Sequence, residues 1–166
     1  MKIIIYTDMD GTILDHYTYS FEDVRETLEL LNKKQIPIIF CTSKTKAEIL
    51  FWKKKLSNNH PFISENGGGI FIPKNYFNFN FSYDKIIDGF YCIILGEEYI
   101  ELKKVLDYIK KDFKIKSFDE MDLKEISRIS NFSIEDAKRA KKRDFEIPFI
   151  IKNKNDKNKI LKRIKE

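Results

Sequence analysis

Apolar residues are spaced in two ways along the N-terminal half of the chain. Residues 3–6 form a continuous apolar run, which is typical of a strand buried on both faces of a parallel sheet. The pattern returns at 38–41, and a third short strand begins at 61–64. Apolar residues at helical spacing fill about 24–35 and about 45–56. This order predicts a parallel, right-handed, doubly wound α/β sheet.

The start of the first predicted helix carries a capping signal. Ser20 followed by Asp23 resembles a capping box with Asp in place of Glu. The helical pattern then continues until Ile36-Pro37 stops it. We therefore expect the first helix to begin at Ser20.

The composition changes after Pro73. An aromatic and Asn-rich stretch at 76–81 has neither helical period nor strong turn signals. Beyond it the pattern predicts strands and helices in the order 91–95, 97–111, 113–118, 123–129, 134–142 and 148–151, followed by a last helix. We predict two domains: residues 1–80 form an α/β core, and residues 81–166 form a second α/β module.

Polar residues follow all three predicted strands of the core. Asp8 and Asp10 follow the first strand, Thr42 and Ser43 the second, and the segment 65–67 (Glu65, Asn66 and Gly67) the third. The carboxyl ends of parallel strands line the crevice where open α/β sheets bind ligands. We therefore expect these side chains to converge on one site.

Two carboxylates one residue apart suit phosphoryl transfer. One carboxylate attacks phosphorus, and the other protonates the leaving alcohol and then deprotonates water. We assign these roles to Asp8 and Asp10 respectively, with magnesium held by both and Gly11 permitting a close backbone approach.

Hydroxyls and a cation complete the predicted phosphate site. Thr42 or Ser43 can donate a hydrogen bond to a phosphoryl oxygen, and Lys44 would add positive charge. We include Thr12 among the phosphate-binding residues.

Acidic pairs of this kind also occur in calcium loops and in plain turns. An EF-hand loop starting at Asp8 needs Gly at its sixth position and Glu at its twelfth, where this chain has Ile13 and Tyr19, so a calcium loop is excluded. A plain Asp-Gly turn stays open, although it does not account for the hydroxyls after the second strand.

Composition limits the class of protein. With 166 residues, 42% of them hydrophobic, the chain is long enough to bury a core, and its apolar runs are too short for a membrane helix. We expect a cytoplasmic protein without membrane partners. Cys41 and Cys92 lie in predicted strands without metal-ligand spacing, so we expect two buried free thiols. The net charge of +5 would fit nucleic acid, but no motif supports it, and we expect no nucleic-acid partner.

Residues 7–15 resemble motif I of the haloacid dehalogenase superfamily of phosphohydrolases. Segments 15–19, 41–45 and 61–68 resemble its subfamily IIB, in the mannosyl-3-phosphoglycerate phosphatase branch, which has an inserted α/β cap. Segment 143–149 also looks like that branch, except that Ile147 stands where the branch has Glu.

The resemblance implies a phosphoric monoester hydrolase with a Rossmannoid parallel core and a cap. It implies that Asp8 is the nucleophile, that Asp10 is the acid/base, and that magnesium is bound by the Asp8 carboxylate and the Asp10 carbonyl. It also implies that Arg143, with Glu65 and Asn66, faces the sugar or glycerate part of mannosyl-3-phosphoglycerate. The Ile147 departure leaves open another sugar phosphate, such as sucrose or trehalose phosphate.

Two motifs of the superfamily have no counterpart in this chain. These are a Lys that neutralises the phosphoryl charge and an acidic Gly-Asp segment that completes the magnesium shell. We therefore expect an N-terminal piece of such a phosphatase, with an incomplete core and weak magnesium binding. A catalytically inert fragment that binds phosphorylated ligands or another polypeptide is the alternative function.

Overall fold

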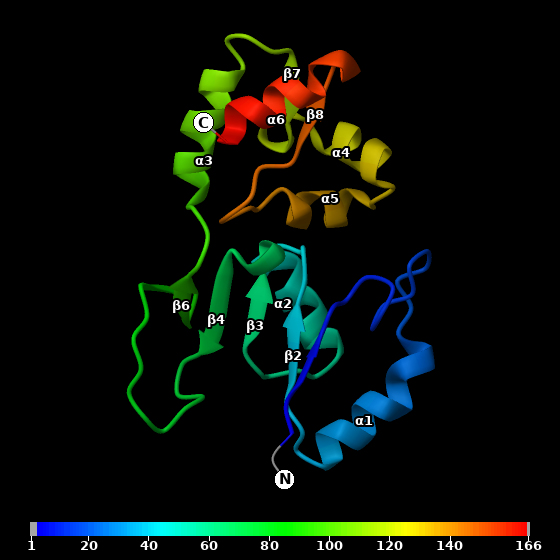
Figure 1. Ribbon diagram of the computed structural model, residues 1–166. Helices are drawn as coiled ribbons and strands as arrows, with labels where there is room; N and C mark the ends of the chain where they lie inside the picture. The colour runs from blue at the N-terminus through cyan, green and yellow to red at the C-terminus, as the bar shows by residue number, and fades with distance from the viewer. Residues whose placement is uncertain (1–2, 166) are drawn as a thin grey trace. The chain divides into compact units, whose positions relative to one another are not determined.

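The computed structural model describes residues 3–165. The chain folds as two compact units, Met1–Gly96 and Glu97–Glu166. Together they form the mixed α/β architecture that the pattern of apolar residues predicts. Figure 1 shows the elements of each unit.

A six-stranded sheet forms the centre of the first unit, in the spatial order β1-β2-β3-β4-β6-β5. Neighbours pair in parallel from β1 to β3 and antiparallel from β3 onwards. The strands are β1 (Ile5–Thr7), β2 (Ile38–Cys41), β3 (Phe62–Ser64), β4 (Gly69–Pro73), β5 (Lys85–Ile87) and β6 (Phe90–Ile94). The pairing of β1, β2 and β3 confirms the predicted parallel α/β sheet, and the antiparallel strands extend it.

The first unit extends further along the chain than the predicted core of residues 1–80. It ends at Gly96, because β5 and β6 hydrogen-bond into the same sheet as β4. That the two units are the catalytic core and the cap of a phosphatase stays a prediction.

Two helices follow β1 and β2. Helix α1 (Arg25–Lys33) is preceded by the 3-10 turn η1 (Glu22–Val24), and helix α2 spans Lys46–Lys55. The predicted capping box at Ser20 is wrong: the Ser20 hydroxyl accepts a hydrogen bond from Glu22 N, and α1 begins only after the 3-10 turn. Helix α2 does begin with a capping box, between Thr45 and Glu48.

The core of the first unit lies between the sheet and α2, which stands behind the sheet in Figure 1. Phe40, Phe62, Phe71 and Cys92 lie at matching positions of four neighbouring strands, and each is at most 1% exposed. The Phe62 and Phe71 rings stack with centroids 5.0 Å apart. These contacts fix the strands whose ends carry the predicted site.

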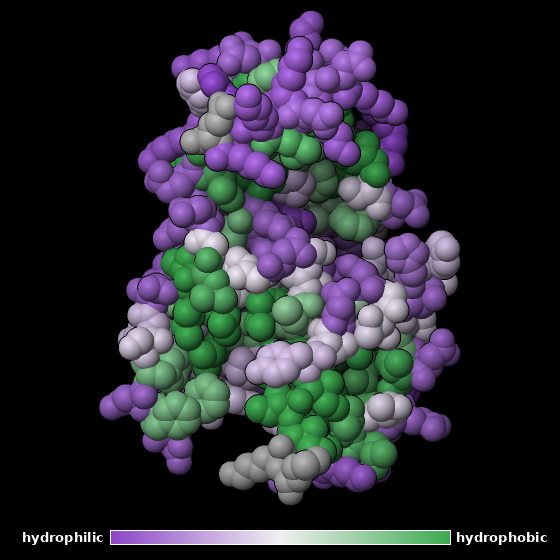
Figure 2. All heavy atoms as spheres, in the orientation of Figure 1, coloured by the Kyte–Doolittle hydropathy of each residue, from purple (hydrophilic) through white to green (hydrophobic). Residues whose placement is uncertain are grey.

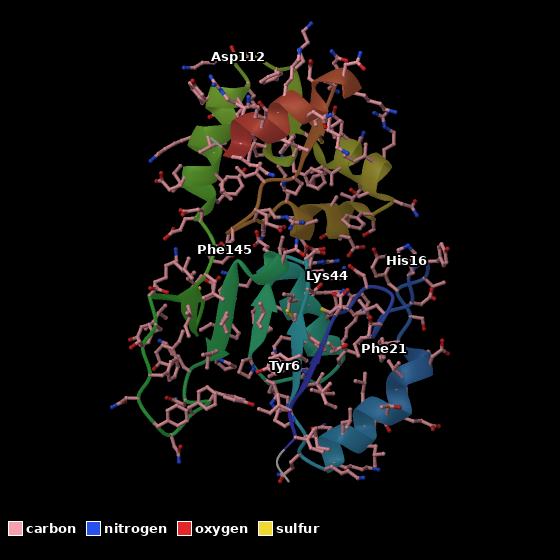
Figure 3. All side chains as sticks on the ribbon, in the orientation of Figure 1. Tyr6, His16, Phe21, Lys44, Asp112 and Phe145 are labelled. Atoms are coloured by element: carbon pink, nitrogen blue, oxygen red, sulfur yellow. The ribbon has the colours of Figure 1, made fainter. Side chains whose placement is uncertain are left out.

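The opposite side of the sheet is more exposed. Tyr6, labelled in Figure 3, is 64% exposed on β1, which is an edge strand of the described sheet. Ile3 and Ile4, just before β1, are about half exposed. Apolar side chains are visible in this part of the surface in Figure 2.

Within residues 97–165, the second unit has four helices and a short antiparallel ribbon. Its elements are α3 (Tyr99–Ile109), β7 (Ile115–Ser117), η3 (Phe118–Glu120), α4 (Leu123–Ser130), α5 (Ile134–Ala140), β8 (Phe149–Ile151), η4 (Lys154–Asp156) and α6 (Lys157–Lys165). Met121, Ile126 and Ala137 form a buried cluster there. Each predicted strand and helix of this region is present to within a few residues. Within residues 3–165, no helix combines the length and the apolar character that crossing a bilayer requires.

Candidate active site

The turn after β1 presents two carboxylates on either side of a buried methionine. Met9 is fully buried, and its carbonyl oxygen accepts hydrogen bonds from the backbone N–H groups of three residues further along the turn, 12–14. Gly11 follows with φ +71°, a conformation that glycine adopts without strain. Asp8 is exposed, and the Asp10 side chain is one-third exposed. The tight turn therefore holds both acidic residues at the end of β1.

Asp8 faces a hollow that the ends of three parallel strands build. The hollow is lined by Asp8, Cys41, Thr42, Ser43 and Asn66. Asp8 follows β1, Cys41 ends β2, and Asn66 lies just after β3. The structure thus brings together residues that the sequence analysis places at three separate strand ends. Their chemical roles stay predictions.

Backbone hydrogen bonds connect the loop after β2 with the loop after β3. Asn66 N donates to the Thr42 carbonyl oxygen at 3.1 Å, and Glu65 N donates to the Lys44 carbonyl oxygen at 3.1 Å. Thr42 itself is 4% exposed, and its hydroxyl oxygen accepts a hydrogen bond from Lys44 N at 3.3 Å. Thr42 therefore lines the hollow and is at the same time bonded to the backbone of the loop that follows β2.

The loop after β3 has an unusual backbone. The 3-10 turn η2 (Glu65–Gly67) has three consecutive residues with positive φ: +49° at Glu65, +54° at Asn66 and +97° at Gly67. Non-glycine residues adopt this region rarely and at a cost in energy, and such residues cluster at functional sites. Glu65 is 2% exposed and belongs to the interior, whereas Asn66 is exposed and lines the hollow.

Lys44 is directed toward Asp10. Its ammonium Nζ lies 2.8 Å from Asp10 Oδ1 and 4.0 Å from Glu48 Oε1, and the residue is 5% exposed. Figure 3 labels Lys44. Its prediction as a phosphate ligand is untested, but in this structure its charge is already paired with a carboxylate.

Two further predicted residues have other neighbours within their own units. Thr12 lines a second hollow together with Asp15, His16 and other residues of the segment 11–24. Arg143 belongs to the second unit, where its guanidinium bonds Glu146 Oε2 at 2.9 Å and the Ala140 carbonyl oxygen at 3.0 Å. Their roles toward a phosphate or a sugar stay predictions.

One cysteine departs from the prediction of two buried thiols. Cys92 is fully buried, but Cys41 is exposed and lines the hollow beside Asp8. Cys41 is the last residue of β2 and follows the buried Phe40, so its side chain lies on the other face of the sheet from the layer under α2. Its position at a strand end, next to Thr42, is the signal in the sequence that points to this exposure.

The oxygen donors near Asp8 suit a hard cation. The Asp8 carboxylate and the Asp10 backbone carbonyl are of the type that Mg²⁺ prefers, and Mg²⁺ commonly keeps several waters and binds through one or two carboxylates. Across residues 3–165, no group of three or more His, Cys, Asp or Glu side chains is placed to hold a metal ion. The Asp8 carboxylate and the Asp10 carbonyl are therefore the groups of this turn that would hold such an ion, which would supply positive charge beside a phosphoryl group.

The family model of the haloacid dehalogenase-like hydrolases matches residues 5–166. The chain belongs to this family. The resemblance of residues 7–15 to motif I of the superfamily is therefore confirmed, and so is the predicted fold class.

Two curated members of the family are similar to the chain over most of its length. Proteins of Persephonella marina and Methanococcoides burtonii, both named glucosyl-3-phosphoglycerate/mannosyl-3-phosphoglycerate phosphatase, are each 44% identical to it. The matches cover 93% and 90% of this chain but only 57% and 56% of the relatives. The chain thus spans somewhat more than half the length of these relatives.

Two solved structures have a similar fold. A Thermoplasma acidophilum protein matches with a TM-score of 0.64 and 16% identity, over 99% of this chain and 57% of its own. A subclass IIB sugar phosphatase of the superfamily matches with a TM-score of 0.58 and 17% identity, over 98% of this chain and 64% of its own. At these identities the likeness concerns the fold alone.

Proposed function

We propose that this chain carries the nucleophile and the acid/base of a magnesium-dependent phosphatase. The observation that supports the proposal is the hollow in which Asp8 lies beside Thr42, Ser43 and Asn66, at the ends of three parallel strands. A carboxylate, hydroxyl donors and an amide at one such crevice are suited to a phosphate monoester.

The reaction follows from the two carboxylates. An Asp8 oxygen attacks phosphorus, the bond from phosphorus to the substrate oxygen breaks, and Asp10 gives its proton to the leaving alcohol. Water then attacks the aspartyl-phosphate while Asp10 takes up a proton, and the bond from phosphorus to Asp8 breaks. Inorganic phosphate and the free carboxylate are regenerated, so the atoms balance.

The other groups of the hollow hold the phosphate. Thr42 and Ser43 would donate hydrogen bonds to phosphoryl oxygens. A magnesium ion held by the Asp8 carboxylate and the Asp10 carbonyl would offset the negative charge of the phosphoryl group.

The substrate class we propose is a sugar-linked 3-phosphoglycerate, with mannosyl-3-phosphoglycerate preferred and glucosyl-3-phosphoglycerate beside it. The names of the two relatives at 44% identity support this choice. Arg143 in the second unit and the exposed Asn66 are proposed to recognise the part of the substrate beyond phosphate. Glu65, which the sequence analysis groups with them, is left out of this proposal because its side chain is buried. Because Ile147 departs from the branch pattern, another sugar phosphate is the alternative substrate.

Phosphate release from mannosyl-3-phosphoglycerate, with and without Mg²⁺, tests the proposal. We expect Asp8→Asn to lower the rate at least about a thousandfold, because the amide is a poor nucleophile. Asp23→Asn, at an exposed position in η1, is the matched control and should keep the rate. Full activity of Asp8→Asn would refute the assignment of the nucleophile.

A catalytically inert chain with a binding role gives a different result. In that case the unchanged chain releases no phosphate, but its melting temperature still rises with Mg²⁺ and inorganic phosphate. If the chain shows neither phosphate release nor a shift in melting temperature, both functions are contradicted.

A further inference from the structure

The Lys44 side chain is buried, and its ammonium lies next to three side chains. Its Nζ is 2.8 Å from Asp10 Oδ1, 4.0 Å from Glu48 Oε1 and 5.0 Å from the centroid of the Tyr19 ring. The Tyr19 ring in turn stacks on Trp52, with centroids 6.5 Å apart. A lysine that is only 5% exposed has little access to water, so its charge depends on these neighbours.

Glu48 is already engaged by other groups. Its Oε2 accepts hydrogen bonds from Thr45 N and from Thr45 Oγ1, both at 2.9 Å, and it completes the capping box of α2. The shorter distance from Lys44 is the one to Asp10. The charge of Lys44 is therefore directed mainly at the proposed acid/base.

The backbone of Lys44 is held as firmly as its side chain. Lys44 N donates to Thr42 Oγ1, and its carbonyl oxygen accepts a hydrogen bond from Glu65 N. Lys44 is thus attached to the loops after β2 and β3, while its ammonium reaches the turn after β1. A group anchored in this way can fix the orientation of the Asp10 carboxylate relative to Asp8.

We propose that Lys44 is a positioning residue that holds the Asp10 carboxylate in place, and that it is not a ligand of the phosphate. The proposal deepens the proposed phosphatase function, on which its kinetic part rests. Lys44 is not among the residues that line the hollow beside Asp8, which are Asp8, Cys41, Thr42, Ser43 and Asn66. This observation supports the separation of positioning from phosphate binding.

A double-mutant cycle with Lys44→Met and Asp10→Asn tests the contact without turnover. If the ion pair holds Asp10, each single variant lowers the melting temperature by on the order of 5 °C, and the double variant loses clearly less than the sum. Lys46→Met is the matched control, because Lys46 lies two residues away and pairs with Asp88 at 2.8 Å. The fall in melting temperature caused by Lys46→Met should add to the fall caused by Asp10→Asn. If the falls caused by Lys44→Met and Asp10→Asn are strictly additive, the contact between Lys44 and Asp10 is overturned.

Phosphate binding separates positioning from ligation. The rise in melting temperature produced by MgCl₂ and inorganic phosphate should stay within twofold of the unchanged chain in Lys44→Met. Loss of that rise in Lys44→Met but not in Lys46→Met would show that Lys44 binds phosphate, and the proposal would be wrong.

Turnover of mannosyl-3-phosphoglycerate gives the third readout. We expect Lys44→Met to lower kcat roughly 10- to 100-fold with KM within about twofold, since a carboxylate displaced by about 1 Å transfers protons poorly. When Asp10→Asn is already present, Lys44→Met should not lower kcat further. Lys44→Arg should recover part of the kcat that Lys44→Met loses. A raised KM with unchanged kcat would overturn the proposal. If the unchanged chain releases no phosphate while the cycle shows coupling, the phosphatase function fails and the contact between Lys44 and Asp10 stands.

Discussion

Asn66 N donates a hydrogen bond to the carbonyl oxygen of Thr42 at 3.1 Å, and this bond joins the loop after β3 to the loop after β2. The donor lies in a left-handed backbone conformation, with φ +54°. The next residue, Gly67, continues the turn at φ +97°. The position of Asn66 in the hollow therefore depends on a backbone that only glycine adopts easily at 67.

Gly67→Ala should disturb both stability and the hollow. A Cβ at Gly67 meets nothing within 4 Å, so the expected cost, about 1–2 kcal/mol in the free energy of unfolding, comes from the backbone conformation alone. Urea denaturation measures it. We also expect the melting-temperature rise with MgCl₂ and inorganic phosphate to shrink, because Asn66 would shift.

The matched control is Gly89→Ala. Gly89 has φ +84° and also an open space around its Cβ position, but it lies in the turn between β5 and β6. Gly89→Ala should lower the free energy of unfolding by a similar amount and keep the melting-temperature rise with MgCl₂ and inorganic phosphate. An equal loss of phosphate response in both variants would contradict the role of the 65–67 turn.

Thr42→Val removes a hydroxyl at nearly constant volume. The Thr42 oxygen accepts a hydrogen bond from Lys44 N, and we propose that its hydrogen is donated to a phosphoryl oxygen. We expect KM for mannosyl-3-phosphoglycerate to rise about tenfold and the free energy of unfolding to fall by about 1 kcal/mol. Thr42→Ser, which keeps the hydroxyl, should keep KM. If Ser43→Ala raises KM and Thr42→Val does not, Ser43 is the phosphate ligand.

The sequence predicted the parallel strands and the convergence of their ends, because buried strands and helical periods are local signals. It did not predict that β5 and β6 join the sheet of the first unit. Lys85–Ile87 has three residues without a clear alternation, and its place depends on pairing with β6. The six-stranded sheet and the boundary at Gly96 follow from that pairing.

The directions of individual side chains were also not predictable from the sequence. The positive charge of Lys44 beside Thr42 and Ser43 was visible, but its burial under the Tyr19 ring was not. Tyr19 adopts φ +55°, and no period in the sequence reports that conformation. Likewise, the exposure of Cys41 depends on where β2 ends.

Lys53 is a buried cation far along α2, and it should make stability depend on pH. It is 6% exposed, and burial lowers its pKa to about 8. Its ammonium donates to Asn58 Oδ1 at 2.7 Å and to the His60 carbonyl oxygen. In the unfolded chain a lysine has a pKa of about 10.4, so between these values the unfolded state binds more protons.

The free energy of unfolding should therefore rise with pH, by about 2 kcal/mol between pH 7 and pH 9.5. This window ends below the range of Tyr76, whose pKa is raised by burial. Urea denaturation at each pH measures the effect. Lys53→Met should remove most of the rise, whereas Lys54→Met, at an exposed position, should keep it. The same slope in Lys53→Met would mean that another group causes it.

The two thiols should react at very different rates. Cys41 is exposed in the hollow beside Asp8, and Cys92 is fully buried between strands. We expect a disulfide reagent such as dithionitrobenzoate to modify one thiol of the folded chain quickly and the second only in denaturant. Because the label at Cys41 fills the space beside Thr42 and Asn66, it should abolish the melting-temperature rise with MgCl₂ and inorganic phosphate. Cys41→Ser should keep that rise in the presence of the reagent, and equal reaction rates of the two thiols in the folded chain would contradict the placement of Cys41.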